Sequence, residues 1–191
     1  MMPGYFQINL HLPWSDPLGR NIRLFYLFRM CFNARFYYPV FAILFLDLGL
    51  SVEQFAWLNV VWAATIVVLE VPSGAVADAL GRVRMLQLAG FLMVGEMVLL
   101  MLAAAEGAHA GAVFGLLLAN RVVSGAAEAM ASGADEALAY DSLVAVHFEK
   151  DWERVLAKAM RYQSAAFIVA MLAGGYLYDV EAWQDRVPGW F

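Results

Sequence analysis

The sequence contains little charge and only one cysteine, and each shortage excludes a class of protein. Of its 191 residues, 15% are charged whereas 63% are hydrophobic. A soluble domain of this length cannot bury so much apolar surface, so we expect a membrane protein. The single cysteine, Cys31, excludes an intrachain disulfide, and its aromatic neighbours predict a buried, inert thiol. The net charge of −5 does not favour nucleic acid as a partner.

The patterns that mark enzyme chemistry are also missing from the sequence. The three histidines, His11, His109 and His147, are too scattered for metal ligands, and neither a Ser-His-Asp set nor a phosphate-binding loop occurs. We therefore expect no enzyme activity, no metal site and no cofactor. The first twenty residues contain three prolines and no continuous apolar run, so they do not resemble a cleavable signal peptide.

Long apolar segments, by contrast, are abundant. Five of them are long enough to cross roughly 30 Å of hydrocarbon as helices. They cover residues 24–47, 54–76, 85–105, 111–134 and 159–178. Their continuous apolar character argues against strands, whose open edges lipid cannot satisfy. The sequence predicts an all-α, polytopic membrane helical bundle of five full transmembrane helices, with residues 183–191 as the stub of a sixth.

The basic residues predict how the chain is oriented in the membrane. Short loops rich in Lys and Arg tend to remain cytoplasmic. Eight of the twelve basic residues would then lie on one side: Arg20, Arg23, Arg82, Arg84, Lys150, Arg154, Lys158 and Arg161. The opposite loops carry acidic residues and one basic residue, Arg186. We therefore expect residues 1–23 to form a cytoplasmic N-terminal segment and residues 24–191 to form the membrane domain.

The loop between the second and third predicted spans combines glycine, aspartate and arginine in the stretch GAVADALGRVR. Gly74 would let a neighbouring helix approach, and Gly81 permits a sharp turn. Asp78 can accept hydrogen bonds from exposed amides at a helix N-terminus. Arg82 and Arg84 would then anchor the cytoplasmic face. These five residues predict a hinge at the cytoplasmic side.

This stretch resembles the signature loop between helices 2 and 3 of the major facilitator superfamily, G-x-x-x-D-[RK]-x-G-R-[RK]-[RK]. Ala79 and Val83 depart from that pattern because they lack the expected charge. Glycine, aspartate and arginine also occur in ordinary cytoplasmic loops. Here, however, the stretch follows the second predicted span and lies on the predicted cytoplasmic side, as the signature loop does. The stretch NRVVSGAAEA, with Arg121 before Gly125, is similar to the family's helix 4 motif.

The resemblance extends from about residue 21 to residue 179 and corresponds to the N-terminal half of a twelve-helix member. It implies that residues 24–191 form an incomplete six-helix half in a bacterial inner (plasma) membrane. The implied partners are membrane lipid, a small-molecule substrate, and a second transporter half or a homo-oligomer. It further implies that Arg121 lies beside the central cavity and assists proton coupling.

Several polar residues interrupt the apolar segments. At 100° per residue, one narrow face of the fourth predicted helix collects Arg121, Gly125, Glu128, Ser132 and Asp135. Arg121 and Glu128 are about 10 Å apart along the helix axis, so they cannot pair directly. A charged residue within a membrane span is by default a candidate functional residue. The alternative for the arginine is a buried ion pair with another helix, with Glu96 as the partner.

The first predicted helix carries two arginines that cannot face the same narrow pore, because Arg29 and Arg35 are about 120° apart around the helix. We expect Arg29 to snorkel or to make a structural contact near the inner end. Arg35 lies deeper, next to Asn33 and Tyr37. These three residues are candidates for contacting a substrate, and Pro39 can kink the helix and expose them.

Two further features concern the gate and the packing of helices. Asp135, Glu136 and Asp141 can pair with Arg82 or Arg84 and hold a cytoplasmic gate, for which Asp141 is the best candidate. Gly174 and Gly175 permit a close helix approach.

Two classes of function remain open from the sequence. The first is the N-terminal portion of a secondary active transporter that moves a small molecule by alternating access and is inactive as a lone monomer. The second is a non-transport membrane scaffold or partner-binding subunit that reuses this helical half. A truncated product with no independent activity is a third possibility. A transporter should lose activity when Arg121 is replaced by alanine, whereas a scaffold should tolerate that change.

Overall fold

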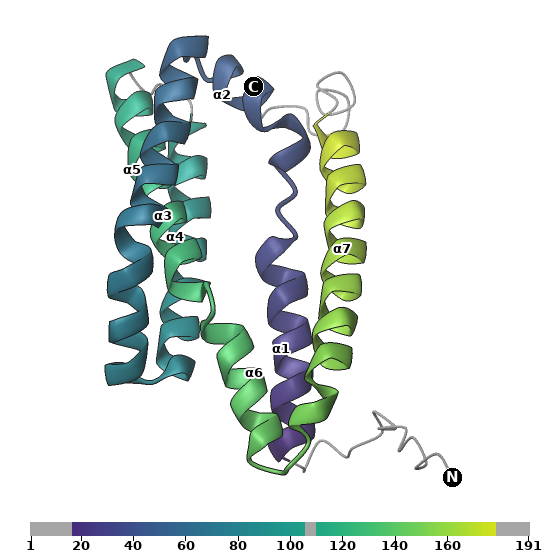
Figure 1. Cartoon of the computed structure of the whole chain (residues 1–191). Helices are drawn as coiled ribbons and strands as arrows, with labels where there is room; N and C mark the ends of the chain where they lie inside the picture. Colours follow the sequence, from purple (N-terminus) through teal and green to yellow (C-terminus); the bar gives the residue numbers. More distant parts are fainter. Residues whose placement is uncertain (1–16, 106–109, 179–191) are drawn as a thin grey trace.

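The computed structural model describes residues 17–105 and 110–178, and in these ranges it contains helices and short connections but no strand. The helices run roughly side by side along one direction (Figure 1). Four stretches are long and apolar enough to cross a membrane: Val52–Leu80, Arg82–Ala103, Gly111–Val144 and Glu149–Leu177. The expected all-α membrane bundle is therefore confirmed in its class. The expected stub at residues 183–191 lies outside the described residues.

The first predicted span is not one continuous helix. Helix α1 covers Pro17–Asn33, a short 3-10 helix η1 covers Tyr38–Val40, and α2 covers Phe41–Asp47. Pro39 accounts for the break, because in a continuous α-helix it could not donate to the carbonyl of Arg35, four residues earlier, and its ring would clash with that carbonyl. The prediction of a full helix over 24–47 was wrong in this respect. Helix α1 also begins within the segment that we had separated as residues 1–23.

The second span is one long helix, and the third follows it after a single residue. Helix α3 covers Val52–Leu80 and α4 covers Arg82–Ala103. At the start of α3, the Ser51 hydroxyl accepts from the Gln54 amide at 3.1 Å, and the Gln54 side chain accepts from the Ser51 amide at 2.9 Å. This reciprocal cap satisfies two amides that have no partner within the helix. Gly81 makes the tight turn between the helices with φ of 91°, as the sequence predicted.

The fourth predicted span, 111–134, corresponds to one helix, and a second, shorter helix follows it. Helix α5 covers Ala110–Ala131 and α6 covers Ala134–Val144. Gly133 between them has φ of 72°, a left-handed conformation that glycine adopts at little cost. The break redirects α6 away from α5 and toward α1 (Figure 1). A short 3-10 helix η2 (Glu149–Asp151) then leads into α7 (Trp152–Leu177).

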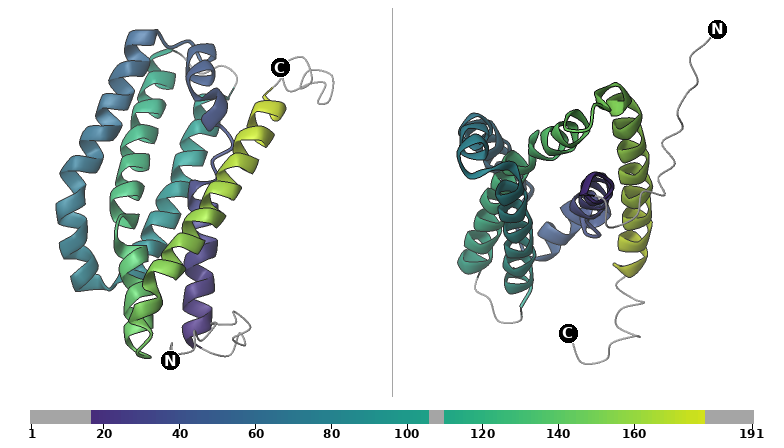
Figure 2. Two further views of the ribbon diagram at one scale, coloured as in Figure 1. Left: turned by 45° about the vertical axis from the view of Figure 1, so that its right-hand side comes forward. Right: turned by 90° about the horizontal axis from the view of Figure 1, so that it is seen from below.

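The helices form two groups that α6 connects. Helices α3, α4 and α5 pack together, while α1 packs along α7. Figure 2 shows α6 running between the two groups in the view along the bundle. The α3–α4 turn and the α6–α7 connection lie toward the end where α1 begins, and the α2–α3 connection lies at the opposite end (Figure 1).

Two glycines allow close helix contacts. A methyl group on Gly125 would lie 2.8 Å from the carbonyl oxygen of Trp62 in α3, and one on Gly174 would lie 1.7 Å from that of Phe36. The predicted close approach is therefore confirmed at Gly174. It is wrong at Gly175 and at Gly74, where an added methyl group would meet nothing within 4 Å.

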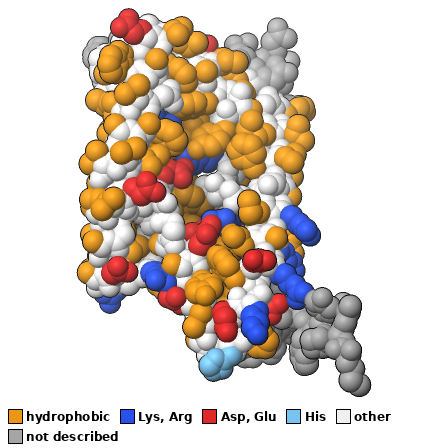
Figure 3. Space-filling view, viewed as in Figure 1, with side chains coloured by type: hydrophobic (Ala, Val, Ile, Leu, Met, Phe, Trp, Pro, Cys, Tyr) orange, Lys and Arg blue, Asp and Glu red, His pale blue; other side chains and the backbone are white. Residues whose placement is uncertain are grey.

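Apolar side chains cover much of the face of the bundle that Figure 3 shows. Large exposed hydrophobic side chains include Val67, Val71, Phe91 and Leu172. A soluble protein seldom exposes so much contiguous apolar surface, whereas a lipid-facing surface requires it. Cys31 is also exposed, so the prediction of a buried thiol was wrong.

Candidate functional site

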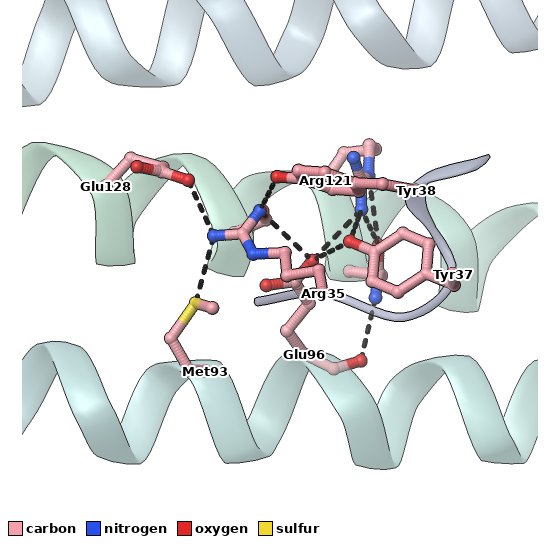
Figure 4. Close-up of polar contacts among 9 residues, drawn as sticks. Arg35, Tyr37, Tyr38, Met93, Glu96, Arg121 and Glu128 are labelled. Carbon is pink, nitrogen blue, oxygen red and sulfur yellow. Dashed lines mark hydrogen bonds and ion pairs between the residues drawn. The ribbon is translucent and has the colours of Figure 1, made fainter. Parts of the chain in front are cut away.

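The break in the first span places Arg35 inside the bundle. Residues 34–37 leave the helical path, and the Arg35 side chain is only 4% exposed. Its Nη2 lies 2.6 Å from Oε1 of Glu128 in α5, and its Nη1 lies 3.8 Å from Oε1 of Glu96 in α4. Nη1 also donates to the hydroxyl of Tyr38. One guanidinium thus contacts carboxylates from two helices (Figure 4).

A second arginine approaches the same carboxylate from α5. Nη2 of Arg121 lies 3.2 Å from Oε1 of Glu96, so the ion pair weighed from the sequence is present. The Tyr37 hydroxyl donates to the same oxygen. Asn120 supports the pair, because its Oδ1 accepts from Nε of Arg121 at 2.9 Å while its Nδ2 donates to the Glu96 backbone carbonyl at 2.7 Å. The Arg121 guanidinium also lies 4.8 Å from the ring centre of Phe41.

We call Arg35, Glu96, Arg121 and Glu128 the four-charge cluster. Its two arginines and two glutamates balance, which limits the cost of holding charge in a low-dielectric interior. Although the charges balance, not every polar atom of the cluster has a hydrogen-bond partner. Oε2 of Glu96 is buried without a hydrogen-bond partner in the described part of the chain, and the Glu96 side chain is fully buried.

The structure brings four of the five predicted cavity or coupling residues into direct contact. Arg35 contacts Glu128, and Arg121 contacts Tyr37 at 3.2 Å. Asn33 stands apart, since its side chain donates to the Arg29 carbonyl. Glu128 and Arg121 have no direct contact in the structure, in line with their spacing on the helix. They are linked instead through Arg35 and Glu96.

Sequence reasoning undervalued Glu96 and missed Asn120. Glu96 was considered only as a structural partner of Arg121, yet it contacts both arginines of the cluster. It is also the only charged residue within 85–105, and that isolation in an apolar span is a signal the sequence does carry. No comparable pattern marks Asn120, whose role depends on its position facing α4.

A cavity of about 400 Å³ adjoins the four-charge cluster. Its wall includes Asn33 and Glu128, and it lies among α1, the α5–α6 junction and α7. Figure 3 shows acidic and basic side chains in the hollow at the centre of the face that it presents, with further charged side chains toward the lower end.

A second ion-pair group lies closer to the end of the bundle where α1 begins. Nε of Arg29 lies 2.8 Å from Oδ2 of Asp135, and its Nη2 lies 2.5 Å from Oε1 of Glu136. The structural contact expected for Arg29 is therefore present. The expectation that Asp135 and Glu136 pair with the arginines of the α3–α4 turn was wrong, because the break at Gly133 turns α6 toward α1.

The hinge residues of the α3–α4 turn mostly line one groove. It has a volume of about 770 Å³ and includes Asp78, Gly81, Arg82, Arg84 and Asp141. Arg82 forms an ion pair with Asp141 of α6, as the sequence suggested. Asp78 lies within α3 and its exposed side chain forms no hydrogen bond within the described residues, so the predicted cap of a helix N-terminus was wrong. Gly74 lies away from this groove.

Within the described ranges, no group of three His, Cys, Asp or Glu residues could hold a metal ion. Of the histidines, His147 lies in the α6–α7 connection with φ of 62°. His11 and His109 lie outside the described residues.

Long apolar helices around a buried, balanced charge cluster define a polytopic helical membrane protein. The family model of the Major Facilitator Superfamily matches residues 24–184, and the chain belongs to this family. Members of the family are transporters, and membership supports that class for this chain. Comparison with curated proteins and with solved structures gave no match.

Proposed function

We propose that the chain is the N-terminal portion of a secondary active transporter that moves a small molecule by alternating access. The observation that carries the proposal is the four-charge cluster at the break in the first span. In transporters built from repeated halves, substrate and coupling ions bind near the midplane, where helices are discontinuous. The cluster combines such a discontinuity with ionisable groups that a purely structural core does not need.

The proposed roles follow from the contacts. Glu128 and Asn33 face the cavity and contact the substrate, together with Tyr37 at the break. Arg35 and Arg121 both contact the buried Glu96, so a change in the contact of one arginine alters the electrostatic environment of the other. This sharing supports a coupling role for Arg121, because a proton on Glu96 would weaken both ion pairs at once.

The groove at the α3–α4 turn is proposed as a cytoplasmic gate. Gly74, Asp78, Gly81, Arg82, Arg84 and Asp141 form this motif, and the exposed Asp78 is free to contact a second transporter half or another copy of the chain. Transport requires two halves that rock against each other, so we expect a lone monomer to be inactive. The basic residues at the same end favour a cytoplasmic N-terminus in a bacterial inner membrane.

A flux assay tests the proposal. The purified chain is reconstituted in liposomes loaded with the pH-sensitive dye pyranine, at low and high protein density. A panel of small organic cations, organic anions, sugars and amino acids is then added. We expect at least one compound to change the internal pH at high density, and Arg121→Ala to abolish that change.

Arg161→Ala is the matched control, because Arg161 is exposed on α7. Its flux should equal that of the unmodified chain. A folded Arg121→Ala protein with unchanged flux, or the absence of flux from the whole panel at every density, would instead support a membrane scaffold.

A further inference from the structure

The cavity beside the four-charge cluster has a wall whose chemistry selects for charge. Its volume of about 400 Å³ can hold a small organic molecule. The residues that decide its chemistry are Phe28, Phe32, Asn33, Glu128, Glu136 and Gln163. They come from α1, α5, α6 and α7, so the pocket is formed by tertiary packing rather than by one helix.

Glu128 presents a half-used carboxylate to this cavity. Its Oε1 accepts from Arg35, while no hydrogen bond in the described part of the chain involves its Oε2. The Glu128 side chain is 30% exposed whereas that of Arg35 is 4% exposed. Figure 4 shows Arg35 on one side of the carboxylate, with the second oxygen directed away from the guanidinium. A ligand in the cavity can therefore reach the acid without first reaching the arginine.

Two aromatic rings complement this acid. Phe28 and Phe32 stack with ring centres 5.0 Å apart, and both line the cavity. The face of an aromatic ring attracts a cation, and quaternary ammonium groups are recognised in this way. Arg35 already lies 5.8 Å from the ring centre of Phe32, which shows that the ring accepts a positive neighbour.

The charges around the cavity favour a positively charged ligand, as the aromatic rings do. Three carboxylates line it, those of Glu128, Asp135 and Glu136, and the lining includes one cation, Arg29. Arg29 is engaged with two of the carboxylates. Even when Arg35 is counted behind Glu128, the acids exceed the arginines by one. An anionic ligand would meet repulsion, whereas a cation would restore the balance.

We propose that this cavity binds a small organic cation, with its positive group at Glu128 and its apolar part over Phe28 and Phe32. The inference deepens the proposed transport function by naming the substrate class, and it rests on that function only for the transport step. Asn33 and Gln163 supply amide groups that can accept or donate hydrogen bonds to polar substituents of the ligand.

The position of Arg35 links the bound cation to the rest of the cluster. The cation at Oε2 and Arg35 at Oε1 share the single negative charge of Glu128, so a bound cation weakens the contact between Arg35 and Glu128. Arg35 already lies 3.8 Å from Glu96, so loss of the Glu128 contact leaves it with Glu96 as its remaining carboxylate partner. Glu96 in turn contacts Arg121. Cation binding at the cavity is thereby transmitted to the second arginine.

Equilibrium binding to the full chain in lipid nanodiscs tests the inference without requiring transport. The probe is benzyltrimethylammonium, and the control ligand is neopentylbenzene, in which carbon replaces the charged nitrogen. We expect the cation to bind and the neutral isostere to bind at least about tenfold more weakly, because it cannot interact electrostatically with Glu128.

The decisive variant is Glu128→Gln, which keeps the shape of the side chain and removes its charge. It should weaken binding of the cation at least about tenfold, whereas Glu149→Gln, at an exposed position in η2, should not change it. If Glu128→Gln does not fold, Phe28→Leu serves instead. It should weaken binding of the cation and leave that of the neutral isostere unchanged.

Equal binding of the two ligands would overturn the inference, as would unchanged cation affinity in a folded Glu128→Gln protein. The result is separable from the transport proposal. Flux of other compounds without cation binding would reject the cation site and keep the transporter. Cation binding without flux of any compound would keep the site and reject transport.

Discussion

Nε of Arg29 lies 2.8 Å from Oδ2 of Asp135, and this ion pair joins α1 to α6 across 106 residues of sequence. The Asp135 side chain is 8% exposed, so the pair is largely withdrawn from solvent. Its position holds α6 against α1, while α6 also packs against α4 of the other group. The two helical groups of the bundle are thus connected by charge as well as by apolar contacts.

Removal of this pair should weaken the connection between the groups. Arg29→Ala leaves Asp135 buried without its cation, and we expect the free energy of unfolding to fall by roughly 3 kcal/mol. Thermal unfolding in detergent measures the change. Arg161→Ala, at an exposed site, should shift it by less than about 0.5 kcal/mol. Equal shifts in the two variants would show that the pair does not stabilise the bundle.

Variants of the Arg121–Glu96 pair distinguish an effect on stability from an effect on transport. Arg121→Ala should destabilise the protein by roughly 3 kcal/mol, because it removes one of the two cations beside the buried Glu96. Combining it with Glu96→Gln removes the charge that lost its partner and should recover most of that stability. Flux should remain absent in the double variant. Recovery of flux together with stability would reduce the pair to a structural role.

The glycine pair of α7 offers a matched test of packing. Gly174→Ala places a methyl group 1.7 Å from the Phe36 carbonyl oxygen, so α7 must move away from the break in the first span. We expect a loss of about 3 kcal/mol or more, at the upper end for overpacked sites. Gly175→Ala meets nothing within 4 Å and should be neutral or slightly stabilising. Thermal unfolding of both variants in one detergent checks the contrast.

The ion pair between Arg82 and Asp141 should matter for gating more than for stability. Both side chains are partly exposed, and such pairs contribute about 0–1 kcal/mol. Asp141→Lys should therefore change the unfolding temperature little and reduce flux by repelling Arg82. Exchange of the two charges, with Arg82→Asp and Asp141→Arg together, should restore flux. Unchanged flux in Asp141→Lys alone would argue against the gate.

A pH effect is expected at the end of α7, beyond the membrane-spanning helix. Burial and the 2.7 Å hydrogen bond to Asp47 raise the pKa of Tyr178 to about 12. Since this pKa lies above that of an unfolded tyrosine, about 10, the added stability is present below pH 10. It is lost as the pH rises from 10 toward 12. Asp47→Asn should lower the pKa, and absorbance titration near 295 nm against a Tyr178→Phe reference measures it.

Much of the fold follows from local sequence, because length, apolar content and turn residues act over short distances. The long apolar runs predicted the spans, and Gly81 predicted the turn between α3 and α4. Pro39 marks the break in the first segment, whereas Gly133 lies at the end of the fourth segment, just before α6 begins. The predicted roles of the cavity, coupling and gate residues remain predictions.

The sequence by itself determined that this chain is a membrane helical bundle of the major facilitator type, because hydropathy and motif spacing are properties of the linear chain. It also determined which charges lie within the spans. Only the tertiary structure decided how they pair. Arg35 meets Glu128 across 93 residues, and Glu96 meets both arginines. Such pairing depends on helix breaks and on how neighbouring helices face one another, and helical periodicity within a single segment does not fix either.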